Sequence, residues 1–357
     1  AEFYLDVDDI LNSDFHLFPN TTVVHQVDFV HSTLEHFIRL LSDDDLLESA
    51  YTNFKIKFGE KRTLPTYNHF NSRIHVFKNN LIEIFHHNLR ARMMMFSTYE
   101  MGVNQFADMT LEEFKKEKLG LIIPEDFSQP AKNLSIDSRS LPIKFDWSDH
   151  GVITPVKEQK ECNACVMFAI AASLEAIYAI RKNKAVVDLS EQHLLDCASK
   201  ENGYSNNGGC EGNLYQETFQ FAMDYGLVSE HQYPYIGKQT ECKSGFQPIT
   251  KLKSYERVNS RPEDLKAAVL NTGPVPIGIF VYKEFMFYKE GVFDGCIHEN
   301  NIGGHAMVVV GYNDEERVKN YRLKNQWGDT WGEKGFARFI STDSRCGMEK
   351  LAFGLRI

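Results

Sequence analysis

The sequence predicts an α+β protein in which a mainly helical first half precedes a second half of helices and then strands. Three observations lead to this prediction. Helical periodicity runs from about residue 43 to residue 88, an irregular segment with three prolines occupies residues 119–145, and strand-like runs gather beyond Gly273. In the second half, the helical part and the β part can meet at a cleft.

The composition is that of a soluble globular protein and argues against several classes of function. The 357 residues are 43% hydrophobic and carry a formal net charge of −10, so no basic surface for nucleic acid is indicated. No apolar run approaches the roughly 18 residues that a membrane span needs. The chain begins with Ala1, so we expect a trimmed or processed form, with any upstream signal or anchor out of view.

Seven cysteines, all in the second half, predict three disulfides and one free thiol. They stand at positions 162, 165, 197, 210, 242, 296 and 346. Disulfides are typical of proteins in the secretory or endolysosomal route. Two short glycosylation sequons, at Asn20 and Asn133, fit that route.

The first half contains helices with specific patterns. One amphipathic helix is expected around residues 27–41, and RIHVFKNNLIEIFHHN belongs to a longer helical region. Steps of four, three, four and four residues place one set on a single helix face: Arg73, Phe77, Asn80, Ile84 and Asn88. This set leaves two interpretations open, a bland amphipathic helix or a helix with polar contacts to a specific segment. Thr110 and Glu113 have the spacing of a capping box at the start of a further helix.

The segment KEQKECNACVMFA holds two cysteines three positions apart, Cys162 and Cys165. A metal site, a redox pair, or one bonded cysteine beside one reactive cysteine would each fit this spacing. The first two are disfavoured because no other CxxC pair exists to complete a zinc site and no βαβ context accompanies the pair. Cys165 begins an expected helix over about residues 165–180. A helix N-terminus favours the thiolate, so we expect a lowered thiol pKa.

Candidate partners for a catalytic thiolate follow in chain order. His305 stands at the start of the apolar run in GGHAMVVVGY, and Asn325 and Trp327 lie in RLKNQWGDTWGEKGF. A histidine beside a thiolate, oriented by a third group, activates the nucleophile. Gln159, six residues before Cys165, can offer an amide N–H to an oxyanion. Each residue alone could serve packing or a turn, but the four types in order, inside distinctive local sequences, favour catalysis.

These segments resemble those of the zymogens of papain-family cysteine proteases. DWSDHGVITPVKEQ, LSEQHLLDC, GHAMVVVGY and NQWGDTWGEKGF each read like a family block, and the resemblance covers about residues 45–357. His305 and Asn325 follow Cys165 by 140 and 160 residues. YAIRKNK, FYKEGVFDG and the lysine of QKEC are most similar to the apicomplexan falcipain-like branch.

The resemblance implies a papain-like two-lobe fold, a helical lobe and an antiparallel β-barrel lobe, preceded by a mainly helical inhibitory prodomain. We expect four parts: an N-terminal extension of unknown role over residues 1–45, the prodomain over 46–130, a linker near the activation cleavage site over 131–140, and the peptidase domain over 141–357. GVNQFAD matches the prodomain motif GxNxFxD in full, whereas His69 stands where glutamate is expected. The prodomain tail is expected to run through the cleft in the direction that cannot be cleaved.

The resemblance also assigns the site residues. It implies three disulfides: Cys162–Cys210, Cys197–Cys242 and Cys296–Cys346. It implies these catalytic roles: nucleophile for Cys165, general acid for His305, orientation of the imidazole for Asn325, shielding for Trp327, and oxyanion stabilisation for Gln159 with the Cys165 backbone N–H. The implied substrate-binding positions are Trp327, Gly212, Asn213, Leu214, Tyr215, Gly278, Gly304, Ala306 and Leu351. Leu351 stands at the pocket floor, where an acidic residue would accept arginine, so we expect an apolar P2 residue such as Leu or Phe.

Several positions around the nucleophile depart from the family pattern. Glycines are replaced at Lys160, Asn163 and Asn213, serines at Ala164 and Gln326, the tryptophan after the nucleophile at Val166, and the usual Asp or Asn before His305 at Gly304. Glycine is often needed at positive φ, where Asn is tolerated better than Lys. Because the four catalytic residue types are intact, we favour an active endopeptidase. The alternative is a weakly active or inactive papain-fold protein that acts as a binding or regulatory partner.

No metal or organic cofactor is implied. The expected partners are protein or peptide substrates, the chain's own prodomain and cystatin-like inhibitors, with no nucleic acid, and we expect a monomer. The expected location is the secretory route, ending in a lysosome, a vacuole or the extracellular space. Acid should loosen the prodomain as carboxylates such as that of Asp108 are protonated, with cleavage in residues 119–141 and a mature chain that starts near Leu141.

Overall fold

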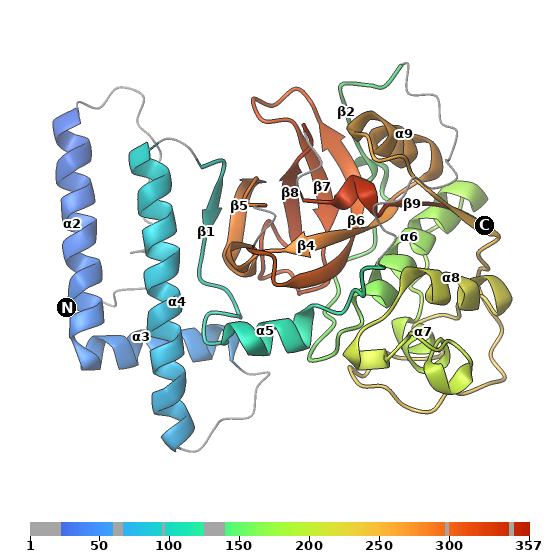
Figure 1. The fold of residues 1–357 in the computed structure, drawn as a ribbon, viewed down its shortest axis with the longest axis horizontal. Coiled ribbons are helices and arrows are strands. Elements are labelled where there is room, and N and C mark those ends of the chain that lie inside the picture. Colours follow the sequence, from blue (N-terminus) through green and yellow to red (C-terminus); the bar gives the residue numbers. More distant parts are fainter. Residues whose placement is uncertain (1–22, 60–66, 95–96, 125–139, 297–299, 343–345) are drawn as a thin grey trace. The chain divides into compact units, whose positions relative to one another are not determined.

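The computed structural model describes residues 23–59, 67–94, 97–124, 140–296, 300–342 and 346–357. The chain divides into two compact units, residues 1–110 with 287–289 and residues 111–286 with 290–357. Figure 1 labels the helices and strands of both units. Each unit is described by itself below.

The first unit is helical. Its elements are α2 (Val23–Ser42), α3 (Asp44–Phe58), α4 (Tyr67–Met94) and the short strand β1 (Tyr99–Met101). Asp43 caps α3 by accepting a hydrogen bond from the Leu46 N–H at 3.2 Å, which pairs one of the donors that a helix start leaves open. α2 includes the helix that the sequence predicts around residues 27–41.

Polar contacts from one face of α4 decide between the two interpretations of its pattern. The Asn80 amide donates to the Ala107 carbonyl at 2.8 Å and to the Met109 carbonyl at 3.0 Å. Asn88 exchanges two hydrogen bonds with the Met101 backbone, at 2.7 Å and 2.9 Å. The patterned face of α4 therefore binds the GVNQFAD segment and its flanks specifically, and the bland interpretation is wrong.

The same segment is tied to α3 and α4 through Asp108. The Arg73 guanidinium donates to the Asp108 carbonyl at 3.0 Å, and the Tyr51 hydroxyl donates to its carboxylate at 3.1 Å. The Lys55 ammonium lies 3.7 Å from the same carboxylate. Phe77 of α4 is fully buried beside these contacts. The unit thus combines a buried apolar core with a carboxylate that holds charged and polar partners.

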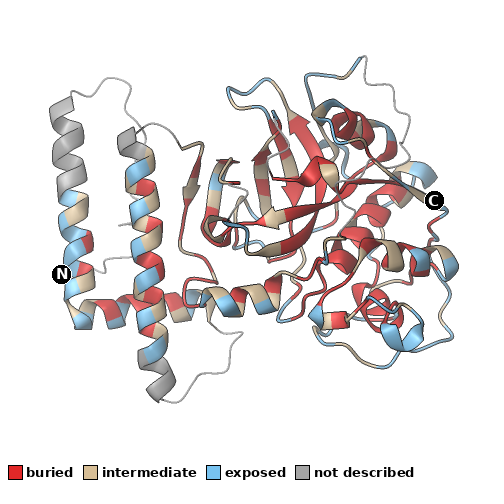
Figure 2. Ribbon diagram, viewed as in Figure 1, coloured by how far each residue is buried: buried red, intermediate tan, exposed pale blue. Residues whose placement is uncertain are grey.

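The second unit contains the remaining helices, which are α5 (Leu111–Lys118), α6 (Cys165–Lys182), α7 (Glu191–Cys197), α8 (Tyr215–Asp224) and α9 (Pro262–Thr272). α6 is apolar and alanine-rich, and it is buried along most of its length (Figure 2). It ends at Asn183, whose left-handed backbone caps the helix. Ser190 caps α7 by accepting from the His193 N–H at 2.9 Å.

The strands form a mainly antiparallel lobe. They are β2 (Lys144–Asp146), β3 (Ser254–Arg257), β4 (Val275–Val281), β5 (Tyr288–Phe293), β6 (Gly303–Asn313), β7 (Asn320–Lys324), β8 (Phe336–Ile340) and β9 (Phe353–Arg356). β5, β8, β7, β6 and β2 lie side by side in that order, and β3 pairs with β9. β4 pairs with residues 303–309 of β6, on the edge that β2 occupies at residues 311–313. Only the β5–β8 pairing among these is parallel.

The two lobes of the second unit meet along α6. This helix packs against β6 on one side and against α7 and α8 on the other (Figure 1). The register of β4 on β6 places Gly278 opposite Ala306 and Ile279 opposite His305. The helix start and the histidine strand are therefore brought together from residues 140 positions apart, as the sequence predicts for an α+β fold with two lobes. No helix of the described residues is long and apolar enough to span a membrane.

Candidate active site

Cys165 is the first residue of α6 and the one free cysteine among the described residues. Cys162 forms a disulfide with Cys210, so the CNAC segment holds one bonded and one free thiol. The other bonds are Cys197–Cys242 and Cys296–Cys346, which are the pairs that the resemblance implies. The Cys165 side chain is fully buried. A metal site or a redox pair at CNAC is incompatible with this pairing.

His305 and Asn325 form a direct hydrogen bond. The His305 Nε2 atom lies 2.8 Å from the Asn325 Oδ1 atom. The backbone N–H of Gln326 donates to the same oxygen at 2.9 Å, which fixes the orientation of the Asn325 amide and means that His305 Nε2 carries the proton. The Trp327 ring lies 4.5 Å from the imidazole, centroid to centroid, and is 1% exposed. Trp327 therefore shields the hydrogen bond from water.

Gln159 reaches the same region from the segment before α6. Its amide Nε2 donates to the Cys162 carbonyl at 2.8 Å, and its Oε1 accepts from the Trp327 indole at 3.1 Å. Its backbone N–H donates to the Gln326 carbonyl at 2.9 Å. These bonds join the helical lobe to the strand lobe and hold the amide beside the start of α6.

The segment that follows α5 runs through the cleft. The Leu121 N–H donates to the Gly304 carbonyl at 3.2 Å, and the Ile122 N–H donates to the Asn213 carbonyl at 3.0 Å. The Asn213 N–H donates to the Gly120 carbonyl at 2.8 Å. Leu121 and Asn213 thus form a parallel bridge. The backbone of residues 120–122 therefore pairs with Gly304, the residue before His305, on one side of the cleft and with Asn213 on the other side.

The Leu121 side chain occupies an apolar pocket. It belongs to one buried cluster with Tyr215, Ala306 and Leu351. A methyl group added at Gly278 would lie 2.4 Å from Leu351 Cδ2 and 2.6 Å from Leu121 Cδ2, so only glycine leaves room there. The pocket positions expected from the sequence therefore come together, except that Leu214 is only half-buried and precedes α8. Gly212, at φ 125°, lies beside the segment and faces Gly120.

α5 packs against Trp327 and the segment before α6. Phe114 is fully buried, and its ring meets the Trp327 ring edge-on at 5.3 Å. The Lys118 ammonium donates to the Lys160 carbonyl at 2.6 Å. The structure thus describes a covered site, in which α5 and residues 119–123 occupy the space above Cys165 and His305.

Burial shifts the pKa values of both Cys165 and His305. Desolvation raises the pKa of the Cys165 thiol to about 11, although backbone groups of Ala306, Gly120 and the helix start act in the opposite direction. Burial also lowers the pKa of His305 to about 4, against the effect of its hydrogen bond to Asn325. The expected lowering of the thiol pKa is therefore wrong for the covered site. The helix N-terminus is present, but loss of water outweighs it, and both groups are neutral.

The departures from the family pattern have distinct consequences. Lys160 has φ 55°, in the left-handed region where glycine is favoured, whereas Asn163 does not have a positive φ. Val166 is fully buried in the apolar cluster. The Asn213 amide donates to the Gly209 carbonyl at 2.7 Å and to the Asn163 carbonyl at 3.2 Å. Each replacement is accommodated, and none displaces His305 from Asn325.

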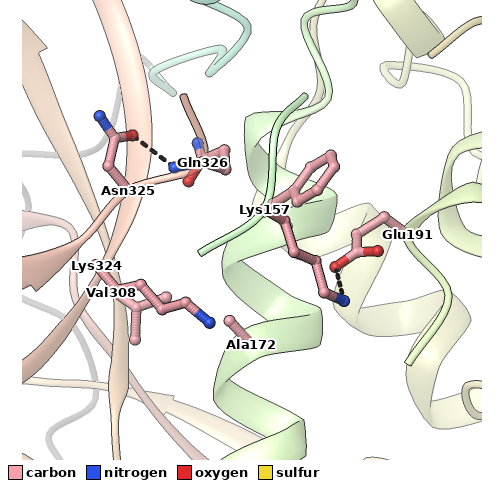
Figure 3. Close-up of a pocket in the computed structure, with 8 residues that line it drawn as sticks. Lys157, Ala172, Glu191, Val308, Lys324, Asn325 and Gln326 are labelled. Carbon is pink, nitrogen blue, oxygen red and sulfur yellow. Dashed lines mark hydrogen bonds and ion pairs between the residues drawn. The ribbon is translucent and has the colours of Figure 1, made fainter. Parts of the chain in front are cut away.

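Charged groups that the sequence analysis missed lie beneath the site, around a small cavity between the lobes (Figure 3). The cavity is lined by Lys157, Phe168, Ala172, Glu191, Val308, Lys324, Asn325 and Gln326. The Lys157 ammonium binds Glu175 at 2.9 Å and Glu191 at 2.7 Å. Burial lowers the pKa of Lys324 to about 8. The only sequence signal for this network was the lysine directly before Asn325.

Gln326 is a second residue that the sequence analysis noted only as a departure. Its side-chain amide donates to the Ala306 carbonyl at 2.8 Å and lies 3.2 Å from His305 Nε2. Gln326, which directly follows Asn325, therefore ties its own segment to β6, the strand that carries His305. The glycosylation sequons at Asn20 and Asn133 lie outside the described residues.

A buried thiol at a helix start, an imidazole held by an asparagine and a covering segment define a thiol hydrolase in a latent form. Residues 141–355 match the family described as Papain family cysteine protease, and residues 51–114 match the Cathepsin propeptide inhibitor domain. The chain belongs to the papain family of cysteine proteases and carries the propeptide of a zymogen.

Curated relatives and solved structures agree. A cathepsin L-like proteinase of Phaedon cochleariae is 35% identical over 78% of this chain and 85% of its own length. Falcipain-2b of Plasmodium falciparum is 32% identical over 94% of this chain and 71% of its own length. The structure of procathepsin L 3 of Tenebrio molitor larval midgut aligns with a TM-score of 0.76 at 28% identity, covering 87% of this chain and 99% of that one. The alternative of a binding protein without protease function is not favoured.

Proposed function

We propose that the released enzyme is an endopeptidase that uses Cys165 as nucleophile, His305 as general acid and base, and Asn325 to orient the imidazole. One observation carries this proposal: the free thiol of Cys165 and the His305–Asn325 pair lie beneath the same covering segment. That segment contacts the thiol through Gly120 and the residue before the histidine through Leu121. A peptide in its place would reach both groups.

In the proposed reaction, proton transfer from Cys165 to His305 gives a thiolate and an imidazolium once water and substrate replace the segment. The sulfur attacks the peptide carbonyl carbon, and the carbonyl electrons move to oxygen. The oxyanion is stabilised by the Gln159 amide and by the Cys165 backbone N–H, which lies in the first turn of α6, where N–H groups lack helical partners. His305 then protonates the leaving amine, and water hydrolyses the thioester.

We infer an apolar P2 preference from the pocket that Leu121 fills in the covered site. Its walls and floor are Tyr215, Gly278, Ala306 and Leu351, and the floor residue carries no charge. Burying a Leu side chain contributes roughly 1.5–3 kcal/mol. An arginine there would place a charge against apolar walls, which is unfavourable unless the charge is paired.

Latency follows from the covered site. The parallel direction of the Leu121–Asn213 bridge supports a segment that fills the cleft without presenting a bond for cleavage. We propose that acid releases it by loosening the first unit, in which the Asp108 carboxylate binds Lys55 and accepts a hydrogen bond from Tyr51. Cleavage within residues 119–141 would then leave a mature chain that starts near Leu141.

The finer setting of the enzyme is also proposed. Three disulfides support the secretory route, with a lysosome, a vacuole or the extracellular space as its end. We expect a monomer and inhibition by cystatin-like proteins. Domain bounds at residues 46–130, 131–140 and 141–357 remain our proposal, as does glycosylation at Asn20 and Asn133.

The test is hydrolysis of matched peptides that differ only at P2, by the acid-treated chain and by its Cys165→Ser variant. We expect cleavage with Leu or Phe at P2, little with Arg, and none by the variant. Turnover by Cys165→Ser at the normal rate would reject the nucleophile, and efficient cleavage with Arg at P2 but little with Leu at P2 would reject the pocket.

A further inference from the structure

The carbonyl groups at the carboxyl end of α5, which the helix itself does not pair, face side chains of the active-site region. A helix leaves its last four carbonyls without helical partners, and they carry partial negative charge. In α5 these belong to residues 115–118, and the Leu119 N–H pairs with the first of them, on Lys115, at 3.3 Å. The remaining carbonyls need donors from elsewhere.

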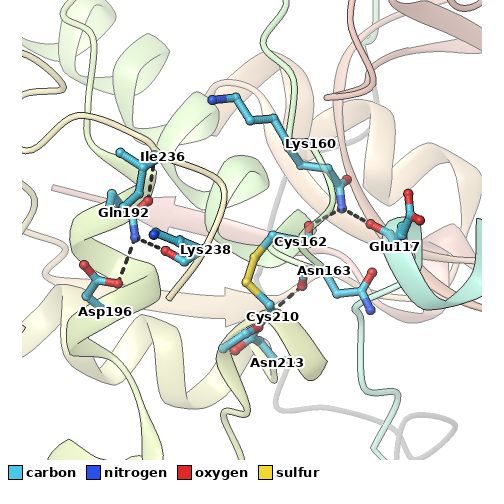
Figure 4. Close-up of a disulfide and its surroundings, with 12 residues drawn as sticks. Glu117, Lys160, Cys162, Asn163, Gln192, Asp196, Cys210, Asn213, Ile236 and Lys238 are labelled. Atoms are coloured by element: carbon cyan, nitrogen blue, oxygen red, sulfur yellow. Dashed lines mark hydrogen bonds between the residues drawn. A yellow bond between two sulfur atoms is a disulfide. The ribbon is translucent and has the colours of Figure 1, made fainter. Parts of the chain in front are cut away.

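Side chains of the active-site region supply these donors. The Asn163 amide Nδ2 donates to the Lys116 carbonyl at 2.7 Å. The Gln159 amide Nε2 lies 3.5 Å from the Glu117 carbonyl, at the limit of a hydrogen bond. Figure 4 shows Glu117 and Asn163 on the same side of the Cys162–Cys210 disulfide. A group placed to stabilise an oxyanion thus faces the negative end of a helix.

Asn163 stands where the family pattern has glycine, and its backbone does not explain its side chain. Its φ is not positive, so glycine is not required there. Its own backbone is held by other residues, because its N–H lies 3.4 Å from the Cys210 carbonyl and its carbonyl accepts from Asn213 at 3.2 Å. The side chain is 94% buried, since the residue is 6% exposed, and its amide is directed to α5.

A second departure from the family pattern favours binding of the same segment, residues 119–123, in the cleft. Gly304 stands where the family has Asp or Asn, and a Cβ added there would lie 2.5 Å from the Leu121 carbonyl oxygen and 3.0 Å from Ile123 Cγ1. Replacement of glycine at 163 adds a donor for the segment, and glycine at 304 makes room for it. Both departures fit the covered form of the enzyme.

We propose that the active-site donors cap the carboxyl end of α5, which takes the place of the oxyanion, and that Asn163 is the part of this cap that sets the latency of this particular zymogen. The inference rests on the proposed oxyanion role of Gln159. Asn163 acts on the closed–open equilibrium of residues 111–123. Its loss removes the side-chain donor that the Lys116 carbonyl has in the covered form.

The test is amide hydrogen exchange of the full-length chain in a Cys165→Ser background, which prevents self-cleavage. Asn163→Gly restores the family residue, and Asn163→Asp keeps the size but removes the donor. Asn271→Asp is the matched control, because the Asn271 amide also donates to a helical carbonyl, that of Ala267 at 2.8 Å, but Asn271 is itself an exposed residue near the end of α9. We expect exchange of the amides at residues 119–122 to become about tenfold faster in both Asn163 variants, which corresponds to about 1.4 kcal/mol.

The control should exchange like the parent, and peptides from α6 should keep their protection in every variant, which excludes general unfolding. Exchange within twofold of the parent in both Asn163 variants would overturn the proposal. An effect in Asn163→Asp alone would also overturn it, because it would show charge repulsion and no role for the donor. Catalysis is not needed here, so inactivity of the released enzyme would reject the proposed function and leave this result standing.

Discussion

Gly120→Ala should open the covered site, because Gly120 packs directly on the backbone of Asn163. An added Cβ would lie 2.0 Å from the Asn163 carbonyl oxygen and 2.5 Å from its Cβ, so either the segment or the nucleophile loop must move. Overpacking of this kind costs about 1–3 kcal/mol. This cost is comparable with the free energy that holds the segment in place, since each of its backbone hydrogen bonds contributes about 0.5–1.5 kcal/mol.

From these terms we expect docking to weaken by about 2–3 kcal/mol, which makes the open form about 30- to 150-fold more populated. The assay is alkylation of Cys165 by iodoacetamide in the full-length chain at neutral pH, located by mass spectrometry. Cys165 is the one free thiol of the described residues, so the label reports the cleft. Ile122→Ala is the control, because that side chain is 41% exposed and its residue binds through the backbone. A rate of Cys165 labelling in Gly120→Ala that is within threefold of the rate in the parent chain would contradict this prediction.

Three further predictions concern the released enzyme and the pH response. Gln159→Ala should lower kcat by about 100- to 1,000-fold through loss of an oxyanion donor, and an unchanged kcat for peptide hydrolysis would contradict that role. Leu351→Glu should move the P2 preference from Leu toward Arg, measured as a ratio of kcat/KM values; a ratio that stays with Leu would place the pocket elsewhere. In a Cys165→Ser chain, burial lowers the pKa of His305 from 6.5 to about 4 in the covered form, so protonation of the imidazole favours the open form. The covered form should therefore lose about 3 kcal/mol of stability, relative to the open form, as the pH falls from 6.5 to about 4. Below pH 6.5, the exchange protection of residues 119–122 should therefore decrease more in this chain than in the chain that also carries His305→Gln. Equal decreases in the two chains would show that His305 does not cause the pH response.

The sequence was sufficient to predict the helix that starts at Cys165, the strand that carries His305 and the grouping of Arg73, Asn80 and Asn88 on one face of α4, although it left open whether that face makes specific polar contacts. These features depend on local periodicity and on short motifs, which remain recognisable in a single chain. The cysteine count likewise predicted one free thiol. The resemblance then supplied the pairing, which spacing alone could not give.

The features that could not be predicted depend on contacts between distant segments. The bond from Asn163 to the Lys116 carbonyl joins residues 47 apart. The side chains of Lys324 and Glu191 line one cavity that exists only where the two lobes pack together. The thiol pKa was predicted in the wrong direction, because a helix start is visible in a sequence and the removal of water by residues 119–123 is not. Local sequence patterns therefore identify the candidate catalytic groups, and the fold determines how far those groups are buried and how their pKa values shift.

The most direct test of the central claim is an active-site titration of the acid-treated chain with a peptidyl epoxide, read by mass spectrometry. We expect one adduct per chain, on Cys165, after removal of the covering segment, and none in the intact chain at neutral pH. Absence of an adduct on Cys165 from a chain shown to have lost residues 111–123 would contradict it.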